Sequence, residues 1–582
     1  MSGHLLLLTI GPVQEFIAQA RRTRDLWYGS HLLSELARAA ARALVQEGAE
    51  LVLPALGAHD PELEPCPGFL RENRTPPASI ANKLLAIVPQ GRNPAATARA
   101  VRAAVLAFWR DELAAPVKEK CRALLAHDVD EIWDEQIESF VEFYASWAPL
   151  DGDYAEARRK LERTVAGRKM LREFAPWKHD RAGAPKSSLD GARVSVLAEV
   201  RSKDLVKKYR LNPGEQLDAV GLVKRAGGEP DQFVPLVNVA LAGWIVEAEQ
   251  LAGDELARLR ERARELDLSR VNRGDLAWTK AFPFDASALI ESRVAPTFEE
   301  LGIAGDPQAF VRRELRPLYR KIAEPSPYVA CLVADGDKMG ERLDQLRDPD
   351  AHRDFSSKLA GFAAKVRKMV ELEHRGSLVY AGGDDVLAFL PVVDAVSCAD
   401  RLRRSFEDVV GGTLSVGIGI GHVMEGMGDL LELGRRAERL AKTLRKALGV
   451  ILDKRSGERR EWKASWCIDP ANRLREDAKL VDEKLSTKKI HEIAAVLRRL
   501  PEPGTVEGDG VAWQRVLEGE VRRALARNEP EALTAEEVGL ELPASYAQAH
   551  EAVGRWVDRL LIARAIAEAQ PRPRRPSVAE AA

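Results

Sequence analysis

The ordered alternation of strand and helix patterns between residues 328 and 447 constrains the fold of this 582-residue chain more than any other feature. Short apolar runs typical of strands alternate there with longer amphipathic segments of helical period. The predicted segments, as strand, helix, strand, strand, helix, strand and helix, are residues 328–335, 353–373, 377–382, 385–391, 394–410, 413–422 and 429–447. The first six follow the order of a ferredoxin-like domain.

The helix predicted over 353–373 carries apolar residues at alternating spacings of four and three. These are Phe355, Leu359, Phe362, Val366 and Met369. Such spacing puts all of them on one face of a helix, so we expect that face to lie on a sheet.

The same order of elements is predicted once more at the N-terminus. Strands are expected at 4–11, 51–56, 83–89 and 139–147, the last as an edge strand; helical segments are expected from Pro12 to Gly48 and over 95–125. Two ferredoxin-like domains in one chain predict the α+β fold class.

The remaining sequence reads as two helical regions. Residues 178–325 contain charged helical segments interrupted by Gly and Pro, and the chain beyond Trp466 is charged and helical. We therefore predict four units: a first ferredoxin-like domain (1–175), a mainly helical insertion (176–325), a second ferredoxin-like domain (326–460) and a C-terminal helical domain (461–582).

Composition excludes several classes of protein. The formal charge of −2 gives no global basic field for nucleic acid, and five scattered cysteines without a C-x-x-C pair encode neither a disulfide framework nor a zinc ribbon. The longest mostly apolar stretch, residues 234–246, is shorter than the roughly 20 residues of a membrane span. We expect a cytoplasmic protein without membrane insertion or a signal peptide.

Three carboxylates are the candidate catalytic groups. Asp335 ends one predicted strand, and Asp384 and Asp385 stand at the tip of the Gly-Gly-Asp-Asp hairpin. A strand–helix–strand–strand unit places its first strand beside its third, so these acids should meet. Clustered carboxylates suit a hard cation such as Mg²⁺. The alternative is that Gly-Gly-Asp-Asp serves only as a hairpin turn.

Glycines and lysines nearby are candidate nucleotide contacts. Gly382 and Gly383 permit positive φ and a close backbone approach, and Lys338 opens the segment after the Asp335 strand. A basic stripe on the helix predicted over 429–447 comprises Arg435, Arg439, Lys442 and Lys446. We interpret Lys442 as a phosphate contact, with a solvated helix face as the alternative.

The residues around Asp335 and Asp384 resemble the palm domain shared by polymerases, nucleotidyl cyclases and GGDEF-type diguanylate cyclases, with Asp385 where the cyclases carry Glu. The N-terminal runs 10–17 (IGPVQEFI) and 23–30 (TRDLWYGS) resemble the first palm of the large subunit of type III-B CRISPR RNA-targeting (Cmr) complexes. Further matches are 82–86 (NKLLA), 214–217 (GEQL) and 223–225 (VKR).

That resemblance implies a nucleotidyltransferase that makes cyclic oligoadenylate from ATP once its complex has bound target RNA. It implies Mg²⁺ or Mn²⁺ at Asp335, Asp384 and Asp385. Nucleotide contacts would be Gly336, Lys338, Gly382, Gly383 and Lys442, with Arg24 and Ser30 serving a second ATP. The implied partners are other Cmr subunits, CRISPR RNA and complementary target RNA.

Because of two departures from the family pattern, we expect neither an HD nuclease site nor a structural zinc site. The chain starts at the first palm strand, and the dipeptides 59–60, 127–128 and 179–180 do not supply an HD nuclease site, so DNase activity is not expected. Residues 186–191 (KSSLDG) stand where many relatives hold zinc with cysteines, so no structural zinc is expected. A non-catalytic scaffold and a stand-alone diguanylate cyclase remain the alternative functions.

Overall fold

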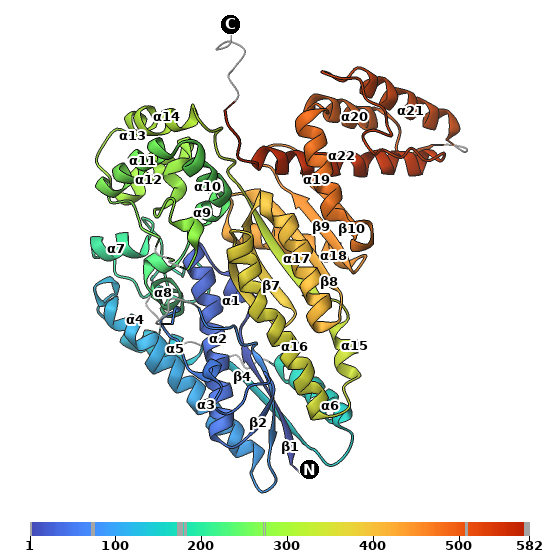
Figure 1. Cartoon of the computed structure of the whole chain (residues 1–582). Coiled ribbons are helices and arrows are strands. Elements are labelled where there is room, and N and C mark those ends of the chain that lie inside the picture. The colour runs from blue at the N-terminus through green and yellow to red at the C-terminus, as the bar shows by residue number, and fades with distance from the viewer. Residues whose placement is uncertain are drawn as a thin grey trace.

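The computed structural model describes residues 3–71, 76–171, 178–179, 183–271, 273, 275–506 and 510–574. Its first sheet has four strands in the order β2-β3-β1-β4 (Figure 1). They are β1 (His4–Gly11), β2 (Glu50–Leu53), β3 (Lys83–Val88) and β4 (Glu142–Pro149). β1 pairs antiparallel with both β3 and β4, which is the ferredoxin-like order, and β4 is an edge strand as predicted.

The helices of this first palm are more broken than the sequence pattern predicts. The segment expected as one helix from Pro12 to Gly48 forms α1 (Gln14–Ala18) and α2 (Thr23–Gln46). The backbone N–H groups of Arg21 and Arg22 donate to the Asp25 carboxylate at 3.0 Å, which caps α2 and stops it from extending backward.

The helix expected over 95–125 is also divided, into α3 (Pro94–Ala107), a wider π-type turn (Phe108–Ala114) and α4 (Ala115–Lys120). Pro116, at the start of α4, has no N–H to donate to the preceding turn, which accounts for the irregular segment. α5 (Asp130–Glu138) and α6 (Tyr154–Met170) complete the unit. The predicted boundary at 175/176 lies outside the described residues.

The second sheet has six strands in the order β10-β9-β8-β5-β7-β6. They are β5 (Tyr328–Gly336), β6 (Ser377–Gly382), β7 (Asp385–Pro391), β8 (Leu414–His422), β9 (Ala447–Leu452) and β10 (Arg460–Ser465). The strands β6-β7-β5-β8 repeat the order of the first sheet, which confirms the α+β class with two ferredoxin-like palms.

β9 and β10 were not expected from the sequence. The helix predicted over 429–447 is α18 (Met427–Lys442), and Ala447 already begins β9, which pairs parallel with β8. All six residues of β9 are buried, so the strand lacks the polar alternation that would distinguish it from a helix end. β10 spans the predicted boundary at 460/461, and we propose that the second palm extends to residue 465.

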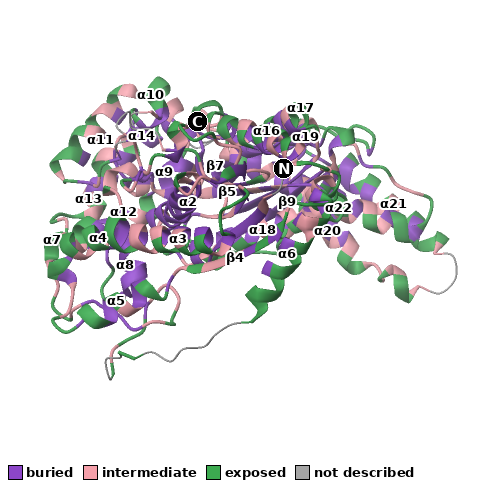
Figure 2. Ribbon diagram, turned by 90° about the horizontal axis from the view of Figure 1, so that it is seen from below, coloured by how far each residue is buried: buried purple, intermediate pink, exposed green. Residues whose placement is uncertain are grey.

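Helices and the first palm cover the two faces of the second sheet. α16 (Pro349–Arg367) and α17 (Val392–Val410) cover one face, and the five apolar residues predicted for this purpose are buried. On the other face, the Trp27 ring of α2 lies 5.8 Å from the Phe389 ring of β7. Figure 2 shows buried residues on α2, β5 and α18, with exposed residues on the outer helices.

The two palms are also joined by polar contacts. The Arg353 guanidinium on α16 binds the Glu50 carboxylate of β2 at 3.0 Å, and the backbone N–H of Ala55 donates to the Ser356 hydroxyl. The Tyr154 hydroxyl of α6 lies 2.7 Å from Nδ1 of His352 on α16. These contacts orient the first palm against α16 of the second.

The other two units are helical. Within the described part of 183–327 the chain forms helices and isolated bridges but no strand. The helices are α7 (Lys203–Tyr209), α8 (Ala219–Ala226), α9 (Leu236–Ala240), α10 (Ala242–Leu251), α11 (Gly253–Glu265), α12 (Glu291–Leu301), α13 (Pro307–Phe310) and α14 (Arg316–Tyr319). The C-terminal helices are α19 (Pro470–Glu483), α20 (Thr487–Arg499), α21 (Val511–Ala526) and α22 (Tyr546–Ala569). Among the helices described, none is long and apolar enough to span a bilayer.

A buried ionic cluster connects the first palm to the helical insertion. Arg225 of α8 binds the Asp25 carboxylate through two nitrogens at 2.5 and 2.8 Å, and it binds Glu215 at 2.9 Å. All three side chains are almost completely buried. The neighbouring Lys224 amine donates to the carbonyls of Phe16 and Gln19, and burial lowers its pKa to about 7.

This cluster predicts a strong effect of Arg225→Met on stability. The variant leaves two buried carboxylates without their cation, so we expect the unfolding free energy to fall by about 3–5 kcal/mol. Chemical denaturation followed by tryptophan fluorescence measures the change. The control is Arg264→Met, which breaks an exposed ion pair with Glu261 and should cost less than about 1 kcal/mol. Equal losses in the two variants would contradict the prediction.

Candidate metal and nucleotide site

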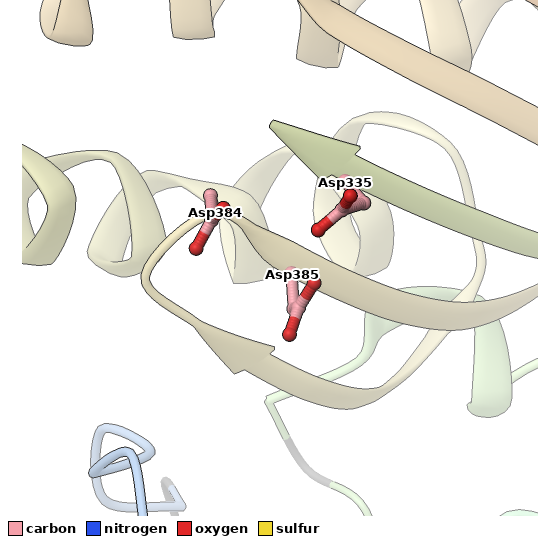
Figure 3. Close-up of side chains that lie close together, drawn as sticks. All are labelled: Asp335, Asp384 and Asp385. Atoms are coloured by element: carbon pink, nitrogen blue, oxygen red, sulfur yellow. The ribbon is translucent and has the colours of Figure 1, made fainter. Parts of the chain in front are cut away.

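Strand pairing brings Asp335, Asp384 and Asp385 together. β5 lies between β7 and β8, with Ala334 opposite Val386, and Gly382 pairs with Asp385 across the β6–β7 hairpin. The end of β5 therefore meets the hairpin tip. Ligand oxygens of the three aspartates all lie within 4.8 Å of one another (Figure 3), as the spacing in the sequence predicts.

Glycines permit this close arrangement. A Cβ on Gly336 would lie 2.9 Å from the Cβ of Asp384, so only glycine lets the end of β5 approach that residue closely. A Cβ on Gly382 would overlap the Tyr380 ring, which covers this position. Gly383 has φ +74°, which the hairpin turn requires. The hairpin-turn interpretation therefore also holds, since the same residues form the turn and carry the acids.

The electrostatics of the cluster favour a bound cation. Burial and the neighbouring Asp385 raise the pKa of Asp384 to about 6, and restricted solvation also raises the pKa of Asp385. A carboxylate with a raised pKa lacks compensating positive charge. An all-oxygen donor set of this kind fits Mg²⁺ or Mn²⁺, so the residues present fit the implied metal.

Among the described residues, Lys442 is the one cation in contact with the aspartate cluster. Its Nζ forms an ion pair with Asp335 and lies 3.1 Å from the Glu438 carboxylate, one turn earlier on α18. Burial lowers the pKa of Lys442. Lys446, predicted on the same helix face, instead lies beyond the end of α18.

Alternating glycines on β8 explain how α18 reaches the site. A Cβ on Gly417 would lie 2.0 Å from the backbone N of Glu438, and one on Gly419 would lie 2.6 Å from the backbone N of Gly434. The helix backbone therefore packs directly on the strand, and this packing carries Glu438 and Lys442 toward Asp335. We did not predict Glu438, although the G-I-G-I-G run and the spacing to Lys442 were visible in the sequence.

Asp337 is a second group whose role was not predicted. Its carboxylate accepts hydrogen bonds from the hydroxyls of Thr413 and Ser415, each at 2.8 Å, and from the backbone N–H of Lys446 at 2.9 Å. It therefore ties the loop after β5 to the start of β8 and to the turn between α18 and β9.

Three residues that were predicted to contact nucleotide, Lys338, Arg24 and Ser30, make other contacts or are buried. Lys338 is half exposed, and its Nζ binds the Glu341 carboxylate at 3.2 Å, within α15 (Met339–Asp344). Arg24 is buried, and the contacts described for it are with Tyr209, Phe233 and Lys208. Ser30 is buried inside α2.

The His-Asp dipeptides and the segment 186–191 also lie outside the aspartate cluster, as far as the structure describes them. His179 pairs with Glu131 at 3.0 Å, and Asp60 caps a short helical turn; Asp180 lies outside the described residues. In the segment 186–191, the Ser187 hydroxyl donates to Asp218 at 2.8 Å.

Comparisons with known proteins agree with the fold. The family described as "Cas10/Cmr2, second palm domain" matches residues 328–448, which contain all three aspartates. The family described as "CRISPR-associated protein Cmr2, N-terminal" matches residues 5–114.

One curated relative is the CRISPR system Cmr subunit Cmr2 of Pyrococcus furiosus, 27% identical over 558 residues. The alignment covers 78% of this chain and 62% of that protein. A solved chain from the apo state of a type III-B Cmr-beta complex superposes with a TM-score of 0.65 at 14% identity, covering 97% of this chain and 81% of that chain. A chain from the same type of complex bound to cognate target RNA gives 0.63 at 15% identity, covering 92% and 80%. These structures share the fold.

The raised pKa of Asp384 predicts how pH affects stability without metal. The folded protein binds this proton more tightly than the unfolded chain, so stability falls as pH rises from about 4 to about 6. In EDTA, Asp384→Asn should raise the melting temperature at about pH 7.5 and leave it unchanged near pH 4. Asp354→Asn on the exposed face of α16 is the control. An unchanged melting temperature at the higher pH would refute the prediction.

Close packing at Gly336 predicts that Gly336→Ala weakens metal binding. The added Cβ displaces Asp384 or Met339, and such indirect disturbances lower metal affinity by about 10–100-fold. Titration calorimetry with Mn²⁺ measures the affinity. Gly340→Ala is a matched control, because nothing lies within 4 Å of its added Cβ. A wild-type affinity in Gly336→Ala would show that Asp384 tolerates the shift.

Proposed function

We propose that this chain, which carries the N-terminal and second palm domains of the Cas10/Cmr2 family, acts as the large subunit of a type III-B CRISPR effector complex. In that role its second palm joins ATP molecules into cyclic oligoadenylate after the complex has bound target RNA. The chain spans about 62% of the length of the curated relative, and its activity, substrates and partners are proposed from the matched part.

The observation that carries the proposal is the convergence of Asp335, Asp384 and Asp385 at one end of the second sheet. The acids come from two strands separated by about fifty residues, and each has a local structural reason to be there. A fold that used this hairpin only as a turn would have no need for a third carboxylate at the end of β5. A purely non-catalytic scaffold is therefore the weaker explanation.

The reaction forms a bond between the 3′-oxygen of one ATP and the α-phosphorus of another, and it breaks the bond to pyrophosphate. When bound by the three carboxylates, Mg²⁺ or Mn²⁺ would lower the pKa of the attacking hydroxyl and offset charge on the phosphoryl oxygens. The carboxylates would hold the cations, and Gly383, with only the Leu359 side chain within 4 Å of an added Cβ, leaves room for the nucleotide at the hairpin. The hydroxyl proton passes to solvent.

Lys442 has two roles in this proposal. Without nucleotide its ammonium group neutralises Asp335, which reduces the repulsion among the acids. With nucleotide bound, the same flexible side chain can turn to the triphosphate as a point charge. Glu438 pairs with Lys442 at 3.1 Å and limits the directions in which the side chain can move.

The partners are proposed on the same basis. They are the other Cmr subunits, CRISPR RNA and complementary target RNA. The solved relatives belong to Cmr-beta complexes, one of them bound to cognate target RNA.

The proposal predicts that Asp384→Asn/Asp385→Asn abolishes synthesis of oligoadenylate. The assembled complex, ATP, Mg²⁺ and target RNA are incubated, and the products are separated by chromatography. Removing ligands for the charge-stabilising ions should lower the rate by about a hundredfold or more.

A matched control is Asp354→Asn/Asp408→Asn, which removes two exposed carboxylates from α16 and α17 and should keep wild-type activity. Oligoadenylate made by the Asp384/Asp385 variant would defeat the assignment of the site. If GTP but not ATP yields a cyclic product, the enzyme is a diguanylate cyclase. If neither yields product with target RNA present, the chain is a scaffold.

A further inference from the structure

A cavity of about 480 Å³ with many charged lining residues lies between the start of α2 in the first palm and the helical insertion. None of its lining residues belongs to the second palm, so it is separate from the aspartate cluster. Six cationic side chains line it: Arg22, Arg24, Lys207, Lys208, Arg210 and Arg270. Only three carboxylates, Asp204, Asp231 and Asp267, line the same cavity. Glu300, Glu229 and Asp285, which lie outside the lining, pair with Arg22, Lys208 and Arg210, whereas Arg24 has no ion pair in the described residues.

Arg24 is the least satisfied of these cations. Its side chain is 5% exposed, and its Nε and Nη2 have no hydrogen-bond partner. The remaining nitrogen, Nη1, lies 3.5 Å from the Lys208 carbonyl, at the limit of a hydrogen bond. A buried guanidinium without an acceptor is costly, and burial lowers the pKa of Arg24 to about 10.

Aromatic rings fix the orientation of Arg24. The guanidinium carbon lies 5.3 Å from the Tyr209 ring centre and 5.4 Å from that of Phe233, which itself lines the cavity. No carboxylate binds Arg24 in the described structure, whereas Arg210 binds Asp285 at 2.5 Å and Lys207 binds Asp267 at 2.9 Å. The site thus holds a preoriented donor that lacks an anionic partner.

The cavity mouth adds two exposed lysines and a helix terminus. Lys207 and Lys208 are about half exposed, with 46% and 44% of their side-chain surface accessible, and they pair with Asp267 at 2.9 Å and with Glu229 at 3.4 Å. Thr23, the first residue of the 24-residue helix α2, also lines the cavity, and the helix dipole makes that end partly positive.

We propose that this cavity binds a phosphate group, held by Arg24 inside and by Lys207 and Lys208 at the mouth. A phosphate oxygen accepts hydrogen bonds from guanidinium nitrogens in the fork geometry that Arg24 offers. The phosphate belongs either to a free nucleotide or to an RNA backbone. This site would be distinct from the metal-dependent nucleotide site, and the proposal does not depend on the proposed transferase activity.

Binding in EDTA tests the proposal, since it removes the divalent ions that a nucleotide at the aspartate cluster would need. Radiolabelled ATP and a short single-stranded RNA are tested separately by equilibrium dialysis with the full chain. We expect at least one probe to bind, more weakly at high salt, with at least about tenfold loss in Arg24→Gln. Lys208→Gln, which leaves the buried interior intact, should weaken binding about threefold or more.

Two controls make the outcome specific. Arg264→Gln removes an exposed cation from α11 in the same unit and should bind like wild type. Asp384→Asn should also bind like wild type, since the cavity is apart from the hairpin. Binding of ATP alone identifies a nucleotide pocket, and binding of RNA alone identifies a backbone contact. The proposal is overturned if neither probe binds wild type, or if Lys208→Gln and Arg264→Gln bind equally.

Discussion

The antiparallel pairing of β5 with both β7 and β8 is the constraint on which the site depends. Asp335 is the penultimate residue of β5, β7 begins with Asp385, and Thr413 and Ser415, just before and at the start of β8, supply the hydroxyls that hold Asp337. Because backbone hydrogen bonds set the register, Asp335 and Asp385 cannot shift without breaking the pairing of their strands, and Asp384 lies in the short turn that joins β6 to β7. The cluster is therefore held together although its members repel one another, and burial near the hairpin raises the pKa of Asp384.

Close backbone packing adds the cationic side of the site. Gly417 and Gly419 allow α18 to lie directly on β8, and this contact is what brings Lys442 to Asp335. The first palm is held to the insertion by Arg225, Asp25 and Glu215. The family resemblance at residues 214–217 and 223–225 thus coincides with an ionic joint between two units, while the acids at 335 and 384–385 have the chemistry of a metal site.

Much of the fold could be predicted from the sequence, because periodicity reports burial on one face. The helix face of Phe355, Leu359, Phe362, Val366 and Met369 and the edge position of β4 are confirmed. β9 could not be distinguished, because a fully buried strand shows no alternation. The break between α1 and α2 depends on the Asp25 cap, and the break between α3 and α4 on Pro116; both are local effects that the apolar periodicity of a helix does not reveal.

The sequence by itself determined which acids meet, since the order of elements implies that the first and third strands of the second palm are neighbours. It also placed Lys442 on the helix that reaches them. Only the tertiary structure decided that Asp337 is a structural acceptor and that Arg24 faces a separate cavity between the first palm and the insertion. The physical reason is that strand order follows from local patterns, whereas the partner of a polar side chain depends on which distant segments pack around it.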